Sequence, residues 1–138
     1  MRILFTGGGT GGHLCPIIAV VRAIKKNYPQ NDLEFLFIGP DDFSQDLLAK
    51  EGIGVKIIST GKLRRYFSLQ TIPDLFRIPL GIIQSLWRVF IFMPDVTFGK
   101  GGYGSLPVVL VSWFFRIPVL LHESDSLPGL TSQFSSRY

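Results

Sequence analysis

The chain has little that would cross-link it or carry it through a bilayer. Its 138 residues contain one cysteine, Cys15, which excludes an internal disulfide framework and suits a reducing compartment. The N-terminal apolar run ends at Phe5 and is too short for a secretory signal peptide. The later apolar stretches, Ile78–Met93 and Leu106–Phe115, are interrupted by Arg88 or are too short to span a membrane. We therefore expect a protein that does not cross the bilayer, and contact with a membrane surface stays open.

Apolar residues are abundant for a chain of this length. They make up 46% of the sequence, and the mean hydropathy is +0.33. This composition predicts a heavily buried sheet, an exposed apolar patch, or both. The length suits one α/β domain with its own core, and no internal repeat or low-complexity tract is present.

Basic residues are concentrated in one part of the chain. The net charge is +4, and residues 56–88 contain six basic side chains against one acid, Asp74. Large apolar side chains follow the basic ones, which favours an anionic membrane surface as partner, and we expect no nucleic acid partner. The alternative is an ordinary core helix whose arginines are solvated. The residues predicted to contact the membrane are Arg64, Arg65, Phe67, Phe76, Ile82 and Trp87.

Short apolar stretches alternate with longer helical patterns along the chain. The alternation predicts a Rossmann-like α/β fold, a parallel sheet with helices on both faces. Ligands bind such sheets at the carboxyl ends of the strands, where each polar or glycine-rich cluster of this sequence falls. Strands are predicted over 2–6, 34–38, 55–59, 95–98 and 118–121, and helices over 16–27, 41–50, 69–92 (broken or bent near Pro73 and Pro79) and 106–115.

The first cluster, Gly7–His13, joins a predicted strand to a predicted helix. Its glycines let the backbone approach a ligand, and the next helix offers free N–H groups and a positive dipole end. A tight turn is the alternative, but this many glycines exceed what a turn needs, so we predict phosphate or sugar binding. The cluster also fits Gly-x-Gly-x-x-Gly, but no acidic residue ends the second strand at Ile38, which disfavours a dinucleotide-binding oxidoreductase.

His13 stands at the end of this cluster, close to the predicted helix. The positive end of a helix disfavours the charged imidazolium, so the ring would be available there as a neutral base. A structural hydrogen-bonding role is the alternative for a single histidine, and the pattern leaves both open.

Two further clusters follow later strands. Gly99–Ser105 follows the fourth strand, and its Tyr103 offers a hydroxyl or a stacking face to a sugar, or else packs on the loop. His122–Asp125 follows the fifth strand and is a poor metal site, because adjacent side chains at a strand exit point in opposite directions. A carboxylate there is better suited to bind sugar hydroxyls or to orient His13. Helix capping by Asp125 is the structural alternative.

Together the three clusters resemble the MurG family of UDP-N-acetylglucosamine:lipid-linked N-acetylmuramyl-pentapeptide transferases. The matching stretches are GGGTGGHLCPIIAV, PDVTFGKGGYGSLPVVL and IPVLLHESDSLPGLTS, and the resemblance extends over nearly the whole chain. It implies the N-terminal half of an inverting GT-B glycosyltransferase without a cofactor or bound metal. Such an enzyme moves N-acetylglucosamine from UDP-N-acetylglucosamine to the 4-hydroxyl of an undecaprenyl-linked N-acetylmuramyl-pentapeptide.

The resemblance also implies roles for individual residues. His13 matches the proposed base, and Glu123 is the second catalytic candidate. Asp125 stands where some family members have an asparagine; an aspartate cannot donate as an amide does, and it would repel a nearby pyrophosphate. The substrate-binding candidates are Thr10, Gly11, Gly12, Gly101, Gly102, Tyr103, His122 and Asp125.

Residues 1–138 are expected to form one acceptor-binding domain, without the donor-binding domain that such an enzyme needs. We therefore expect a fragment that does not transfer sugar by itself. The alternative is a membrane-docking subunit of a split, two-chain lipid-linked glycosyltransferase. The implied location is peripheral, on the cytoplasmic face of the bacterial inner membrane.

Overall fold

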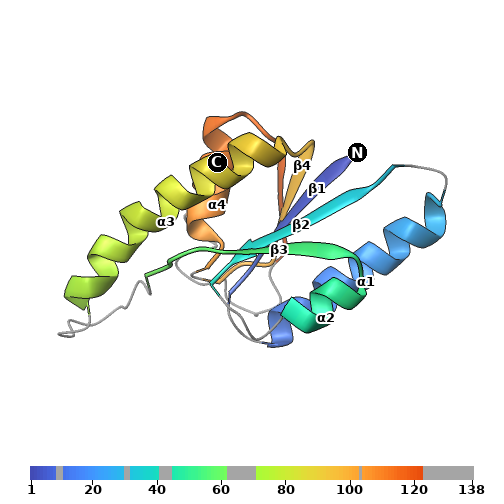
Figure 1. The fold of residues 1–138 in the computed structure, drawn as a ribbon, viewed down its shortest axis with the longest axis horizontal. Helices are drawn as coiled ribbons and strands as arrows, with labels where there is room; N and C mark the ends of the chain where they lie inside the picture. The colour runs from blue at the N-terminus through green and yellow to red at the C-terminus, as the bar shows by residue number, and fades with distance from the viewer. Residues whose placement is uncertain (9–10, 30–31, 41–44, 62–70, 103, 123–138) are drawn as a thin grey trace.

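The computed structural model describes residues 1–8, 11–29, 32–40, 45–61, 71–102 and 104–122, with the backbone alone for Gly11, His13 and residues 71–76. Strands and helices alternate along these residues, and the strands form one parallel sheet in the order β3-β2-β1-β4-β5 (Figure 1). The elements are β1 (Arg2–Thr6), α1 (Gly11–Asn27), β2 (Glu34–Gly39), α2 (Gln45–Lys50), β3 (Ile53–Ile57), α3 (Thr71–Phe92), β4 (Val96–Gly99), α4 (Leu106–Phe114) and β5 (Val119–Leu121).

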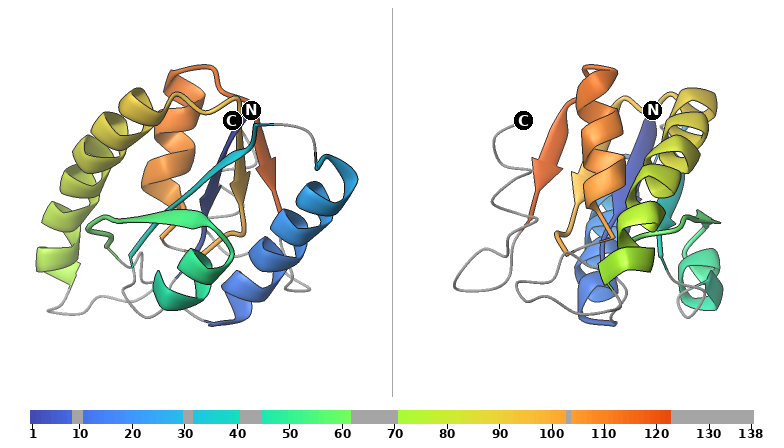
Figure 2. Two further views of the ribbon diagram at one scale, coloured as in Figure 1. Left: turned by 45° about the vertical axis from the view of Figure 1, so that its right-hand side comes forward. Right: turned by 90° about the vertical axis from the view of Figure 1, so that its left-hand side faces the viewer.

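Side-chain alternation along the strands sends apolar residues to both faces of the sheet. In β1, Ile3 and Phe5 belong to one core cluster, together with residues of α1 and α2, whereas Leu4 belongs to a second cluster with residues of α3 and α4. The helices accordingly cover the sheet in two pairs, α1 with α2 on one face and α3 with α4 on the other (Figure 2). The predicted α/β fold with helices on both faces is confirmed.

The central strand β1 marks the point where the strand order reverses. The chain moves outward from β1 through β2 to β3, then returns to the other side of β1 to form β4 and β5. From this reversal point, the segments that leave β1 and β4 run to helices on opposite faces of the sheet. In α/β sheets this is the usual place for a ligand.

The structure corrects the predicted start of the first helix and the predicted break within the third. The first helix begins at Gly11, whereas the sequence pattern predicted Pro16, because Leu14 and Ile17 are buried in the core and hold the glycine-containing first turn against the sheet. A break near Pro73 or Pro79 is also wrong, since α3 is a single helix that contains both prolines, whereas the alternative of a bend stays a prediction. A proline removes one helical hydrogen bond, and packing of the following turns outweighs that loss.

The strand limits shift less. The third strand is Ile53–Ile57 and not 55–59, and the fourth and fifth each start one residue later than predicted. The helix after β2 is described from Gln45, and residues 41–44, where the sequence predicted its start, lie outside the described residues.

Helix α3 is held directly against the segment that follows β3. A Cβ atom added to Gly81 would lie 2.0 Å from the backbone oxygen of Ser59, so the helix can come this close only without a side chain there. One turn later, the Gln84 side chain accepts a hydrogen bond from the Ser59 N–H at 2.7 Å. The exit of β3 is thereby fixed to the helix that covers this face of the sheet.

We predict that Gly81→Ala destabilises the protein, although alanine favours a helix. The added methyl group meets a backbone oxygen that cannot move aside alone, and overpacking of this kind costs about 1–3 kcal/mol. Urea denaturation followed by circular dichroism measures the free energy of unfolding. The neighbouring exposed Leu80→Ala serves as the control and should change it by less than about 0.5 kcal/mol. Stabilisation by Gly81→Ala would contradict the close contact.

Candidate active site at the carboxyl edge of the sheet

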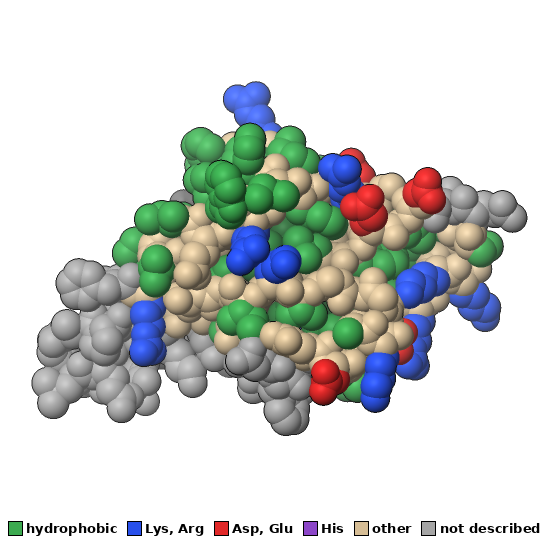
Figure 3. Space-filling model, in the orientation of Figure 1, with side chains coloured by type: hydrophobic (Ala, Val, Ile, Leu, Met, Phe, Trp, Pro, Cys, Tyr) green, Lys and Arg blue, Asp and Glu red, His purple; other side chains and the backbone are tan. Residues whose placement is uncertain are grey.

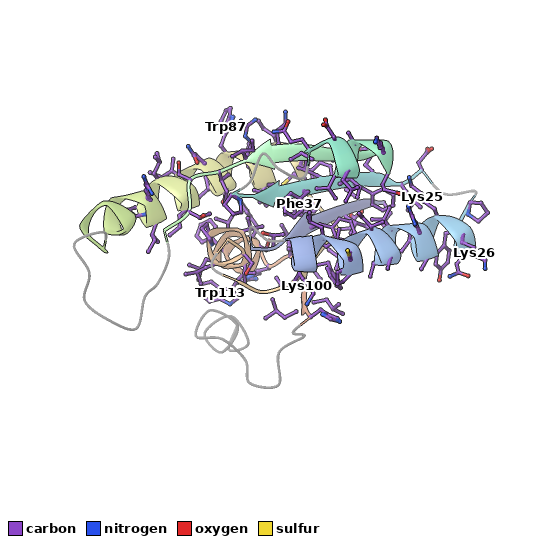
Figure 4. All side chains as sticks on the ribbon, turned by 90° about the horizontal axis from the view of Figure 1, so that it is seen from below. Lys25, Lys26, Phe37, Trp87, Lys100 and Trp113 are labelled. Atoms are coloured by element: carbon purple, nitrogen blue, oxygen red, sulfur yellow. The ribbon has the colours of Figure 1, made fainter. Side chains whose placement is uncertain are left out.

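The loops that follow β1 and β4 are hydrogen-bonded to each other. The Gly8 N–H donates to the Gly101 oxygen at 3.0 Å, and the Lys100 N–H donates to the Thr6 oxygen at 2.8 Å. These bonds continue the β1–β4 ladder beyond the last paired residues, Thr6 and Gly99. The first and second glycine clusters of the sequence therefore form one surface at the reversal point. Figure 4 views the molecule from below and labels Lys100 at this edge.

Glycine is required at several points of this surface. A Cβ atom added to Gly104 would lie 2.6 Å from the Gly7 oxygen and 2.6 Å from Cδ of Pro40, so the loops after β1, β2 and β4 meet here. Gly101 and Gly102 have φ angles of 80° and 82°, in the left-handed region that other residues rarely adopt. The glycines thus allow both the sharp turn and the close approach of the backbones.

Helix α4 begins directly after the second cluster. The Ser105 hydroxyl donates to the Gly102 oxygen at 2.8 Å, and the Ser105 N–H donates to the same oxygen at 3.2 Å, which closes the loop before the first turn. Helix α1 starts at the same edge, at Gly11. The unpaired N–H groups and positive dipole ends of two helices therefore face this edge, an arrangement that favours anionic groups such as phosphates.

The end of β5 joins the same site. The His122 N–H donates to the Gly99 oxygen at 2.7 Å, and the His122 ring is exposed, with its centroid 6.1 Å from that of Phe98. All three clusters that the sequence singled out are thus represented at one edge.

Two buried polar residues of this edge were missed by the sequence analysis. Lys100 is fully buried, and its backbone N–H donates to the Thr6 oxygen at this edge. It is the one charged residue inside the second glycine cluster, a signal that could have identified it. The Thr6 hydroxyl is buried and has no hydrogen-bond partner among the described residues. Nothing in an apolar strand pattern indicates such a group.

The predicted substrate residues are described in part. Gly11 and Gly12 open α1 with the His13 backbone beside them, and Gly101, Gly102 and His122 lie at the same edge. Their proximity agrees with a common site, whereas their individual roles stay predictions. Four candidate residues lie outside the described residues: Thr10, Tyr103, Glu123 and Asp125. The side chain of His13 is likewise not described.

The structure describes the side chains of only two residues that were predicted to contact a membrane, Ile82 and Trp87. Trp87 is 61% exposed on α3. Ile82 is half-buried and packs against the second core cluster, so it is not on the exposed face of the helix. Arg64, Arg65 and Phe67 lie outside the described residues, and only the backbone of Phe76 is described.

Two features bear on metals and membranes. In the part of the chain that the structure describes, no group of three or more His, Cys, Asp or Glu side chains is placed to hold a metal ion. Of the helices described, none is both long and apolar enough to pass through a bilayer.

Among the described side chains, the clearest pKa shifts belong to Arg22 and Glu51 in the scaffold. Arg22 of α1 donates through Nε to Glu51, just after α2, at 3.0 Å. This hydrogen bond lowers the pKa of the Glu51 carboxyl, and the same contact raises the pKa of the Arg22 guanidinium. Both groups lie on the face covered by α1 and α2, where they tie the two helices together.

The fold and the joined glycine loops define an α/β domain with a candidate phosphate-binding edge. Comparison with known proteins gives the family. Residues 3–138 match the glycosyltransferase family 28 N-terminal domain. The chain therefore belongs to this family, and the oxidoreductase alternative is not supported.

Two curated relatives carry the name UDP-N-acetylglucosamine--N-acetylmuramyl-(pentapeptide) pyrophosphoryl-undecaprenol N-acetylglucosamine transferase. The protein from Bacillus cereus, numbered 2 in that species, is 41% identical over 99% of this chain. The protein from Legionella pneumophila is 43% identical over 96% of it. The chain spans 38% and 36% of their lengths, respectively.

The fold also matches a solved structure. The crystal structure of MurG from Acinetobacter baumannii superposes with a TM-score of 0.75 at 23% identity, over 99% of this chain and 38% of that one. This likeness confirms the predicted fold, that of the N-terminal half of a GT-B glycosyltransferase.

We predict that Gly104→Ala separates the loops at the active-site edge. Its methyl group would collide with the Gly7 oxygen and with Pro40, so the Gly8–Gly101 hydrogen bond should weaken. Hydrogen exchange should show faster exchange of the Gly8 amide. Gly54→Ala is the matched control, because a Cβ there makes only an ordinary 3.4 Å contact with Leu36, and the Gly8 amide should then exchange as in the wild type. Equal exchange in both variants would refute the contact.

Proposed function

We propose that this chain is the acceptor-binding N-terminal domain of an inverting glycosyltransferase. The observation that carries the proposal is the hydrogen-bonded pair of glycine loops at the reversal point of the sheet, with the starts of α1 and α4 beside it. Such a surface suits a sugar joined to phosphates. The relatives' names supply the substrates: UDP-N-acetylglucosamine as donor and undecaprenyl-pyrophosphoryl-N-acetylmuramyl-pentapeptide as acceptor.

The reaction would be a single displacement. A base takes the proton of the acceptor 4-hydroxyl while its oxygen attacks the anomeric carbon, and UDP leaves with the bonding electrons. His13, in the first turn of α1, is the proposed base, and Glu123 is proposed to orient it or to bind sugar hydroxyls. General-base assistance is worth about 10²–10⁴ in rate.

The charge that develops on the leaving pyrophosphate needs stabilisation. The N–H groups at the starts of α1 and α4 provide positive potential at this edge. The remaining contacts with the donor are proposed to come from a second, donor-binding domain outside these 138 residues. By itself, the chain is proposed to bind the acceptor and not to transfer sugar.

We predict that His13→Ala, made in the complete two-domain enzyme, lowers turnover by about 10²-fold or more with little change in stability, because the acceptor hydroxyl loses its base. The assay measures transfer of labelled N-acetylglucosamine to a soluble acceptor analogue. Cys15→Ser, two residues further along the same helix and exposed, is the control and should keep normal turnover. Near-normal turnover of His13→Ala would remove this residue from the mechanism.

We further propose that α3 and the end of α4 rest on a membrane surface, where a lipid-anchored acceptor is found. Large apolar side chains on α3 are exposed, among them Ile83 at 66% and Trp87 at 61%, and Phe114 on α4 is 67% exposed. Helices α3 and α4 pack against each other. Hydrophobic side chains gather over α3 on the face that Figure 3 shows. Apolar patches on this scale commonly mark a protein or membrane contact.

Basic side chains accompany the apolar ones. Arg77 and Arg116 are exposed at the start of α3 and after α4, and Arg88 is half-buried on α3. Near an anionic leaflet each such residue contributes about 1 kcal/mol, while inserted apolar groups add to the binding. The proposed location is therefore peripheral, on the cytoplasmic face of the inner membrane, and the half-buried Ile82 has no part in the contact.

We predict that Ile83→Ser/Trp87→Ser weakens vesicle binding, because it removes exposed apolar groups from the proposed contact. Sedimentation with vesicles that contain phosphatidylglycerol measures the bound fraction. Tyr28→Ser/Leu47→Ser is the matched control, since both side chains are exposed on the opposite side of the sheet. Equal binding by the two double variants would place the contact elsewhere.

A further inference from the structure

A cavity of about 240 Å³ lies on the sheet face beside α3, away from the active-site edge. Its floor is the face of β1, β2 and β3, with Leu36 and Lys56 among the lining residues, and its wall is the last part of α3. Arg88, Ile91 and Phe92 line it from the helix, at the spacing that puts side chains on one helical face.

The cavity exists because this part of the sheet is incompletely covered. Helices α3 and α4 pack on each other, and the second core cluster takes its buried side chains from β1, β2, these helices and Ile58, which directly follows β3. Gly54 of β3 pairs with Leu36 of β2 and has no side chain to occupy the space next to it. The opening therefore follows from the packing of α3 and from a glycine on the outer strand.

The charges of the cavity are unbalanced. Arg2 is engaged, because its Nε lies 3.4 Å from Glu34 and its Nη1 donates to the Phe92 oxygen at 3.2 Å. Lys56 and Arg88 form no hydrogen bond or ion pair with other described residues. Two uncompensated cations thus stand beside apolar walls, which suits an anionic group attached to a hydrocarbon part.

The cavity is continuous with the proposed membrane surface. Ile91 lines the cavity and is also 61% exposed, next to Trp87 on the outer face of α3. In Figure 3, Lys and Arg side chains in the middle of the visible face border the apolar area over α3. A lipid at the membrane surface would meet the basic and the apolar parts together.

We propose that this cavity binds the phosphate group of an anionic phospholipid, with Lys56 and Arg88 pairing with the phosphate and Leu36, Ile91 and Phe92 covering the adjoining hydrocarbon. A free phosphate ion would use the two cations and gain nothing from the apolar wall. The inference rests on the proposed membrane contact of α3 and adds a specific lipid site to it.

The test compares two double variants of the full-length protein with equal loss of charge. A short-chain phosphatidylglycerol that stays monomeric in water is titrated against ¹⁵N-labelled protein, and amide shifts give the Kd. Lys56→Gln/Arg88→Gln should raise the Kd by about tenfold or more, since each cation near an anionic lipid is worth about fivefold. Lys26→Gln/Lys50→Gln, whose side chains are exposed on the α1 and α2 side, should change it by less than about twofold.

A third variant removes the space and keeps the charge. Gly54→Leu should place its side chain over Leu36 and weaken lipid binding, and a Cβ is tolerated at this position. Circular dichroism checks that each variant is folded. Equal weakening by both charge variants, wild-type binding by Gly54→Leu, or equally strong competition by inorganic phosphate would overturn the lipid site. Sugar transfer by the complete wild-type enzyme is measured in a separate assay. Failure of the proposed glycosyltransferase function can then be distinguished from failure of the proposed lipid site.

Discussion

The structure depends on the pairing of β1 with strands on both of its sides. Because β2 and β4 are both parallel to β1, their carboxyl ends lie at one edge, and the chain segments that leave them must share that edge. The Gly8–Gly101 and His122–Gly99 hydrogen bonds are consequences of this arrangement. Residues from three distant parts of the sequence meet there with no direct link between them in the chain.

Close approach of backbones sets the chemistry of this edge. Glycines at 101, 102 and 104 let the loops turn and touch, which brings helix starts and the buried Lys100 near one another. Positive potential of this kind is costly to assemble, and an anionic ligand relieves it. The packing therefore assembles an edge that favours anionic groups such as phosphates.

Helix α3 has one face that is buried in the core of the domain and one apolar face that is exposed to solvent. Gly81, Ser85 and Val89 are buried against the sheet side, whereas Ile83 and Trp87 are exposed. This division explains the high mean hydropathy of the chain: both possibilities that the composition allowed, a buried sheet and an exposed apolar patch, occur together. The cavity beside Arg88 lies where the two faces of the helix meet.

The alternation of strands and helices, the carboxyl-edge position of the clusters and the resemblance to the MurG family could all be predicted before the structure, because they depend on local pattern and residue type. Local pattern could not place the start of α1 at Gly11 or keep α3 continuous through Pro79, since burial of distant residues outweighs local propensity there. The burial of Lys100 and the cavity beside Lys56 were likewise decided by tertiary structure, because both arise from segments far apart in the chain that pack against each other.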